Sequence, residues 1–177
     1  MNLKEDIIVD LVFKCNPSAK KLNYLNIKDD NLIFESIFWE FILSKWIKIL
    51  IEEKLIIKSH NISKQNQFSL SLNIIDNKEI SILNKKWLNK SGATDVISFP
   101  IIDNQLINDL IFVELGDLFI SLEMAFKQAI EYNKSLKQEM LWLASHGLLH
   151  LLGWEHNNDS QLKNMINLQE YLISKLN

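Results

Sequence analysis

The segment 136–152 restricts the possible folds of this chain more than any other part. Leucine, methionine and alanine recur around almost the whole circumference of the helix that this segment predicts, which leaves no wide polar face. A helix that is apolar nearly all round is buried among other elements. We therefore expect a fold in which this helix lies inside, covered by strands and other helices.

The remaining chain mixes strand and helix patterns without strict alternation. Apolar runs and period-two alternation predict strands at 6–15, 68–74, 94–102 and 115–121. Helical spacing of apolar residues predicts further helices at 36–54, 77–89, 122–132 and 160–176. This order favours an α+β fold with a small mixed sheet over a doubly wound fold. The order of the strands cannot be read from the pattern.

The composition predicts one compact domain, residues 1–177. The chain is 47% hydrophobic and has only four glycines and two prolines, which excludes disordered and collagen-like classes. Cys15 is the single cysteine, so no internal disulfide can form, and we expect it to pack in a core strand. The apolar stretch 37–51 contains Glu40, Lys45 and Lys48, and no signal peptide is visible, so we expect a cytoplasmic protein without a membrane span.

The charges limit how the chain could bind an anion. All nineteen basic residues are lysines, none is arginine, and the formal net charge is -3. The bidentate guanidinium fork that grips phosphate best is therefore missing. An anion site must use lysines, backbone amides, helix ends or a metal, and binding of nucleic acid would need a local basic patch.

Three histidines lie in and just after the apolar helix. Three of the four histidines in the chain fall within eleven residues, at His146, His150 and His156. A spacing of four places His146 and His150 on one helical face, separated by about 6 Å along the axis. Gly153 permits a left-handed turn that ends the helix and returns His156 towards the other two. We predict a metal site made of these three side chains.

Burial of the helix favours this interpretation over an incidental pair of histidines. Imidazoles in apolar surroundings are costly unless they are paired or ligate a metal. Three histidines can hold a tetrahedral zinc ion at about 2.0–2.1 Å and leave its fourth position open, which is typical of catalytic zinc. The sequence thus predicts one zinc ion per chain and the hydrolysis of either a phosphodiester or an amide.

Four stretches of the chain carry recognisable motifs: HGLLHLLGWEH at 146–156, LNKKW at 83–87, TDVISFP at 94–100 and LGDLFIS at 115–121. They resemble motifs of the YbeY family of rRNA-maturation endoribonucleases. The family motifs are, in the same order, H-G-x-L-H-L-x-G-[YW]-D-H, L-N-x-x-[YFW], T-D-V-L-S-F-P and L-G-D-I-x-I-S. The first 65 or so residues match the family only in general character.

The resemblance implies a four-stranded sheet flanked by about five helices, with one zinc ion held by His146, His150 and His156. It also implies a metal-dependent endoribonuclease that cuts single-stranded RNA in rRNA maturation and ribosome quality control. The implied partners are rRNA and the ribosome, with the small subunit expected.

Two positions depart from the family pattern. Glu155 stands where the family commonly has aspartate, and the longer carboxylate could still orient a histidine or a water. Leu88 stands where the family usually has arginine. Lys85, Lys86 and Lys90 are the nearest candidates to contact RNA in its place, although the same lysines would also suit a solvated helix face.

Two other functions stay open from the sequence. A zinc peptidase of the H-E-x-x-H type would need a glutamate after the first histidine, where this chain has Gly147, a residue that indicates close approach of backbone or substrate. A ribosome-associated binding protein with a structural zinc would agree with the missing arginine. No general base can be named: Glu155, Asp95 and Asp117 are candidates, each with a credible structural role, and His60 is expected to be exposed.

Overall fold

The computed structural model describes residues 7–16, 31–56, 66–101 and 113–176. Its elements, in chain order, are β1 (Ile8–Cys15), the 3-10 helix η1 (Asn31–Phe34), α2 (Ser36–Glu52), β2 (Gln67–Ile75), α3 (Asn77–Leu88), β3 (Val96–Pro100), β4 (Val113–Ser121), α4 (Leu122–Glu131), α5 (Leu136–Leu151) and α6 (Asp159–Ser174). The predicted strands and α-helices agree with these bounds to within two residues at each end, and η1 was not predicted. His60 lies outside the described residues.

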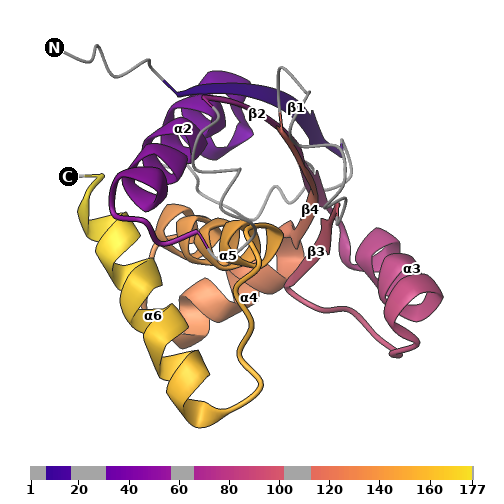
Figure 1. Cartoon of the computed structure of the whole chain (residues 1–177). Coiled ribbons are helices and arrows are strands. Elements are labelled where there is room, and N and C mark those ends of the chain that lie inside the picture. Colours follow the sequence, from indigo (N-terminus) through magenta and orange to yellow (C-terminus); the bar gives the residue numbers. More distant parts are fainter. Residues whose placement is uncertain (1–6, 17–30, 57–65, 102–112, 177) are drawn as a thin grey trace, which may run out of the picture.

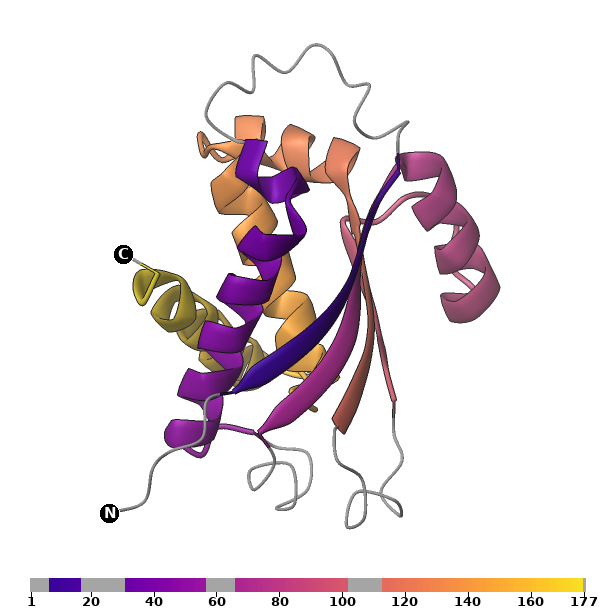
Figure 2. The same ribbon diagram turned by 90° about the horizontal axis from the view of Figure 1, so that it is seen from above.

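The four strands form one mixed sheet in the order β1-β2-β4-β3 (Figure 1). Strand β1 runs parallel to β2, β2 runs parallel to β4, and β3 pairs with β4 in the antiparallel direction. Helices α2, α4, α5 and α6 lie on one side of the sheet, and α3 lies on the other (Figure 2). The expected α+β fold with a small mixed sheet is confirmed.

Helix α5 lies inside the molecule, as its apolar circumference predicts. Eleven of its residues are buried, and they pack against the sheet and neighbouring helices in the main core. The helix begins with a capping box, in which the Ser135 hydroxyl accepts from the Gln138 amide and the Gln138 side chain accepts from the Ser135 amide. The start of this helix and its burial therefore both follow from residues within it and directly before it.

Gly147 permits α5 to approach the sheet closely. A Cβ at this position would lie 2.1 Å from Leu118 Cδ1 and 3.1 Å from Ser98 Oγ. The Ser98 hydroxyl also donates to the Gly147 carbonyl at 3.1 Å. The close approach of another part of the chain, which Gly147 indicated, is therefore confirmed. The part that approaches α5 is the sheet.

Alternating strand residues point to opposite faces of the sheet. Ser98 and Leu118 face α5, so their neighbours in sequence, including Phe99, Asp117 and Phe119, lie on the other face, which we call the open face. Cys15 ends the outer strand β1 and is half-buried at the margin of the core. No helix within the described residues is long and apolar enough to cross a bilayer.

Candidate metal centre

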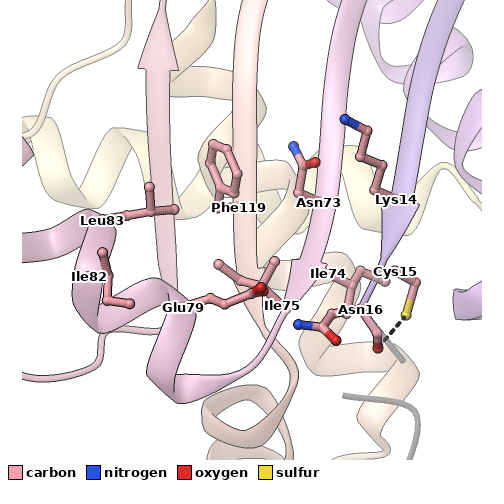
Figure 3. Close-up of a pocket in the computed structure, with 10 residues that line it drawn as sticks. All are labelled: Lys14, Cys15, Asn16, Asn73, Ile74, Ile75, Glu79, Ile82, Leu83 and Phe119. Carbon is pink, nitrogen blue, oxygen red and sulfur yellow. Dashed lines mark hydrogen bonds between the residues drawn. The ribbon is translucent and has the colours of Figure 1, made fainter. Parts of the chain in front are cut away.

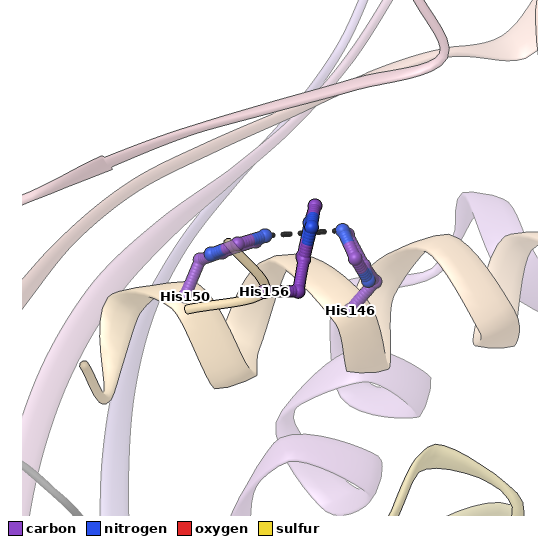
Figure 4. A group of neighbouring side chains, drawn as sticks. All are labelled: His146, His150 and His156. Carbon is purple, nitrogen blue, oxygen red and sulfur yellow. Dashed lines mark hydrogen bonds between the residues drawn. The ribbon is translucent and has the colours of Figure 1, made fainter. Parts of the chain in front are cut away.

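One face of α5 and the segment after it bring three histidines together (Figure 4). The ring centroids of His146 and His150 are 4.6 Å apart, and those of His156 lie 5.3 and 5.1 Å from them. One nitrogen from each ring lies within 4.8 Å of the others. The side chains that the spacing singled out form a cluster that could hold a metal ion.

Hydrogen bonds determine which nitrogen of each helical histidine faces this cluster. His146 Nδ1 lies 3.1 Å from Gln169 Oε1, and His150 Nδ1 lies 2.9 Å from the carbonyl oxygen of Trp154. Both oxygens can only accept, so each Nδ1 carries the ring proton and donates it. The Nε2 atom of each neutral ring therefore presents a lone pair to the cluster.

The Nε2 atoms of His146 and His150 lie 3.1 Å apart. Two lone pairs at this distance repel each other unless a proton or a cation lies between them. A tetrahedral zinc ion with bonds of about 2.0–2.1 Å holds two ligand nitrogens about 3.3 Å apart. The pair thus fits zinc closely, and neutral imidazoles also suit copper, iron and nickel.

Burial favours the neutral, metal-binding form of both helical histidines. Loss of hydration lowers the pKa of His146, an effect that its hydrogen bond with Gln169 opposes. Burial, followed by the charges of His146 and His156, lowers the pKa of His150 to about 4. Because protons compete with metal for imidazole nitrogen, this shift reduces the competition at neutral pH.

The turn after α5 sets the position of the third histidine. Gly153 has a φ of 91°, in the left-handed region that favours glycine. The Trp154 amide donates to the Leu149 carbonyl at 2.9 Å, and its indole Nε1 donates to the Leu55 carbonyl at 2.9 Å. Trp154 thus ties the turn to α5 and to the chain just after α2. His156 is exposed, so the cluster opens to solvent on its side.

Sequence reasoning missed Gln169, which orients His146 from α6. This side chain is buried, and its Nε2 donates to the Trp142 carbonyl at 3.1 Å while its Oε1 accepts from His146. Such a partner fixes the tautomer and orientation of a metal-binding imidazole. A signal was present, because Gln169 falls between Met165 and Leu172 on the apolar stripe of α6, where a polar side chain needs a partner.

The structure separates the three carboxylates that were candidates for a general base. Asp117 lies on the open face, away from α5, so it does not face the histidines. Asp95 precedes β3, and one of its oxygens accepts from Gln128 Nε2 at 2.9 Å, which gives it a structural role. Glu155 is exposed in the same loop as His156. Glu155 is the candidate that shares a segment with the cluster.

The three lysines predicted to contact RNA lie around the C-terminal end of α3, across the sheet from α5 (Figure 2). All three are exposed. Lys85 Nζ lies 3.4 Å from Asn89 Oδ1, and Lys86 Nζ lies 4.9 Å from the ring centroid of Trp87. The structure does not bring Lys85, Lys86 or Lys90 into the histidine cluster, and their contact with RNA stays a prediction.

Comparison with known proteins assigns the chain to a family. Residues 38–177 match the family model described as Endoribonuclease YbeY. The chain belongs to the YbeY family. The resemblance carried by the motifs at 83–87, 94–100, 115–121 and 146–156 is thereby confirmed.

Similar YbeY proteins extend over nearly the whole chain. One from Prochlorococcus marinus subsp. pastoris, named Endoribonuclease YbeY, is 62% identical over 172 residues, covering 97% of this chain and 96% of that protein. Another of the same name, from Prochlorococcus marinus strain SARG, is 34% identical over 179 residues, covering 99% and 91%. A solution structure from Thermotoga maritima has the same fold, with a TM-score of 0.52 at 18% identity, covering 93% of this chain and 87% of that one.

Proposed function

We propose that His146, His150 and His156 hold one zinc ion and that this YbeY family member is an endoribonuclease that cuts single-stranded RNA in rRNA maturation. The facing Nε2 lone pairs on α5 carry the metal proposal, because 3.1 Å is a separation that a bound cation stabilises. Relatives named Endoribonuclease YbeY support RNA as the substrate. When bound, zinc with three protein ligands supplies Lewis-acid chemistry at its open position.

The residues of the chain prepare this site on two sides. On the inner side, buried leucines of α5 exclude water, and Gln169 and the Trp154 carbonyl hold the Nδ1 protons of the helical histidines. On the outer side, the exposed His156 leaves room for a phosphodiester to approach from solvent. Glu155, in the same loop, is our candidate to accept a proton during cleavage.

The peptidase alternative loses support at position 147. The H-E-x-x-H enzymes place their general base directly after the first histidine. Here Gly147 faces β4, and a side chain would meet Leu118 at its first carbon atom. A glutamate at this position would overlap the core instead of reaching the metal. Among the described residues the cluster offers three ligands, which favours a catalytic ion, because structural zinc sites have four protein ligands.

The proposed setting follows from the same family resemblance. We take residues 1–177 as a single metal-dependent hydrolase domain that works in the cytoplasm on rRNA and the small ribosomal subunit, in rRNA maturation and ribosome quality control. Because the chain has no arginine, lysines, backbone amides, helix ends or the metal would have to hold the RNA phosphates.

The test is to purify the full chain, measure its metal content, and assay single-stranded RNA, base-paired RNA and casein side by side. We expect about one zinc per chain and zinc-dependent cutting of the single-stranded RNA alone. His150→Ala should lose both the metal and the cleavage. His60→Ala, which removes the one histidine that the segment 146–156 does not contain, is the matched control and should keep both.

Two results would overturn the proposal. Full zinc retention in a double variant with His146→Ala and His150→Ala would refute the ligand assignment. Zinc-dependent cutting of casein, with RNA left intact, would replace the ribonuclease with the peptidase.

A further inference from the structure

The open face of the sheet carries a pocket beside α3 that the histidine cluster does not use (Figure 3). Its volume is about 600 Å³, and it lies where β1, β2 and β4 meet the first turns of α3. Ile75, Leu83 and Phe119 give it apolar walls, and Lys14, Asn73 and Glu79 add polar groups. A cavity of this size, apolar with a few convergent polar groups, is typical of small-molecule sites.

Three of these residues form a straight row across neighbouring strands. Lys14 of β1 lies directly opposite Asn73 of β2, and Asn73 lies directly opposite Phe119 of β4. Strands lie about 4.8 Å apart, so the row from Lys14 to Phe119 spans about 10 Å. Residues paired in register on one face point the same way. A cation, an amide and an aromatic ring therefore stand side by side, in that order.

Asn73 offers a hydrogen-bond acceptor in this row. Its side chain is only 8% exposed, and its Nδ2 donates to Ser71 Oγ at 2.8 Å and to the Leu118 carbonyl at 3.3 Å. Both hydrogens of this amide are therefore used within the protein, and the group that Asn73 can offer to a ligand is its Oδ1 atom. An amide oxygen only accepts, so it suits an N–H group of the ligand.

We propose that this pocket binds one nucleotide of single-stranded RNA, with its base stacked on Phe119, a base N–H donated to Asn73 Oδ1 and a phosphate at Lys14. A nucleotide carries these features in the same sequence: a flat π-surface, an edge with N–H donors and a negative charge. Base stacking on aromatic side chains is the usual way in which proteins hold single strands. The inference rests on the proposed ribonuclease function for its choice of RNA over a free nucleotide.

The other charges on this face determine the orientation of the nucleotide. Glu79 lines the pocket from α3, on the side away from Lys14 (Figure 3). Glu114 and Asp117 lie farther along β4 on the same face, and Asp117 accepts a hydrogen bond from Ser71. These three carboxylates repel a phosphate, so Lys14 is the position that the phosphate can occupy.

An aromatic row links the pocket to the outer strand β3. The ring centroids of Phe119 and Phe99 are 5.8 Å apart, and those of Phe99 and Trp87 are 5.9 Å apart. Trp87 is 60% exposed at the end of α3. Ser98, next to Phe99, points the other way and donates to the Gly147 carbonyl beside His146. A strand of RNA that follows the aromatic row to β3 therefore reaches the outer strand that packs against α5.

Lys86 stands over the exposed ring of this row. Its Nζ lies 4.9 Å from the Trp87 centroid, a contact worth about 0.5–1 kcal/mol at an exposed site. Stacking of a base is worth about 1–3 kcal/mol, so a base can displace the ammonium, which is then free to pair with a phosphate.

The experiment measures binding of a short, labelled single-stranded RNA with 2′-O-methyl riboses by fluorescence anisotropy, over a range of salt concentrations. Phe119→Leu keeps apolar volume beneath α3 and removes the π-face, and should weaken binding roughly 5-fold to 150-fold. Lys14→Gln should reduce the slope of log affinity against log salt by about 0.7, as for one lost phosphate contact. Lys163→Gln, an exposed lysine on α6, is the matched control and should change neither value.

The result that overturns the pocket is wild-type affinity and wild-type salt slope in both variants. If Phe119→Leu fails to fold, Lys14→Gln decides together with photocrosslinking of 5-iodouridine RNA, which should map to residues 113–121. Displacement of the RNA by adenosine monophosphate at equal affinity per nucleotide would support the pocket and assign it to a free nucleotide. Cleavage is measured separately on unmodified RNA. If the wild type binds RNA through the pocket but does not cut it, only the proposed function is refuted. If the wild type cuts RNA and both variants bind RNA as the wild type does, only the pocket is refuted.

Discussion

Replacement of Gly147 by alanine should destabilise this protein, although alanine is the better helix former. The change from glycine to alanine inside a helix favours folding by about 1 kcal/mol. Against this, the new Cβ would lie 2.1 Å from Leu118 Cδ1, whereas carbon atoms pack at about 3.5–4.0 Å. Leu118 is fully buried, so it cannot turn into solvent. Overpacking of this kind costs about 1–3 kcal/mol, which leaves a net loss of up to about 2 kcal/mol.

The assay is urea unfolding of the metal-free protein, since bound zinc would add its own stabilisation. A thermal scan of the same metal-free protein should agree: at roughly 2–4 °C per kcal/mol for a chain of this length, a loss of up to about 2 kcal/mol lowers the midpoint by up to about 8 °C. A double-mutant cycle with Leu118→Ala isolates the contact. Leu118→Ala alone should lower the free energy of unfolding by about 2–5 kcal/mol. In the double variant with Gly147→Ala it should lower it by less, because Leu118→Ala removes the atoms that clash with the new Cβ. A Gly147→Ala variant that is more stable than the wild type by its full helix propensity would refute the close approach.

Three further predictions concern the metal, the buried carboxylate and the RNA. Gln169→Leu keeps an apolar side chain at this buried position but removes the hydrogen-bond acceptor for His146. Zinc affinity, measured by competition with a chelator, should therefore fall about 10-fold to 100-fold. Unchanged affinity would contradict the role of Gln169. Burial raises the pKa of Glu139 above 4.5, and Lys134 opposes the shift. The folded protein therefore binds a proton at Glu139 more tightly than the unfolded chain does. The resulting stabilisation of the wild type is present at low pH and is lost as pH rises through the folded pKa. Relative to the wild type, Glu139→Gln should therefore gain stability in urea unfolding as pH rises, whereas a pH-independent difference would exclude the shift. Leu88→Arg should steepen the salt dependence of RNA binding by about one counterion, and an unchanged slope in the folded variant would mean that position 88 does not face RNA.

Local patterns in the sequence were enough to predict most elements and the histidine cluster. The helical spacing of His146 and His150 and the turn at Gly153 are short-range features, and both depend on backbone geometry that the sequence specifies directly. The apolar circumference of α5 likewise predicts burial without any knowledge of its neighbours. These predictions hold because the information lies within a few residues.

Features that depend on distant contacts could not be predicted in the same way. The parallel pairing of β1 with β2 joins segments more than fifty residues apart, and no local pattern specifies it. Gly147 indicated a close neighbour, but only the folded sheet identifies Leu118. Lys85 and Lys86 follow one another in a recognisable motif, yet their position across the sheet from α5 depends on where α3 packs.

The hydrogen bond between His146 and Gln169 also makes the histidine cluster depend on a neighbouring helix. Gln169 lies on α6, 23 residues after His146, so His146 has this acceptor for its Nδ1 proton only while α6 stays docked on α5. A change that loosens α6 should therefore release the ring of His146 without unfolding α5. The two helices thus form one support for the cluster.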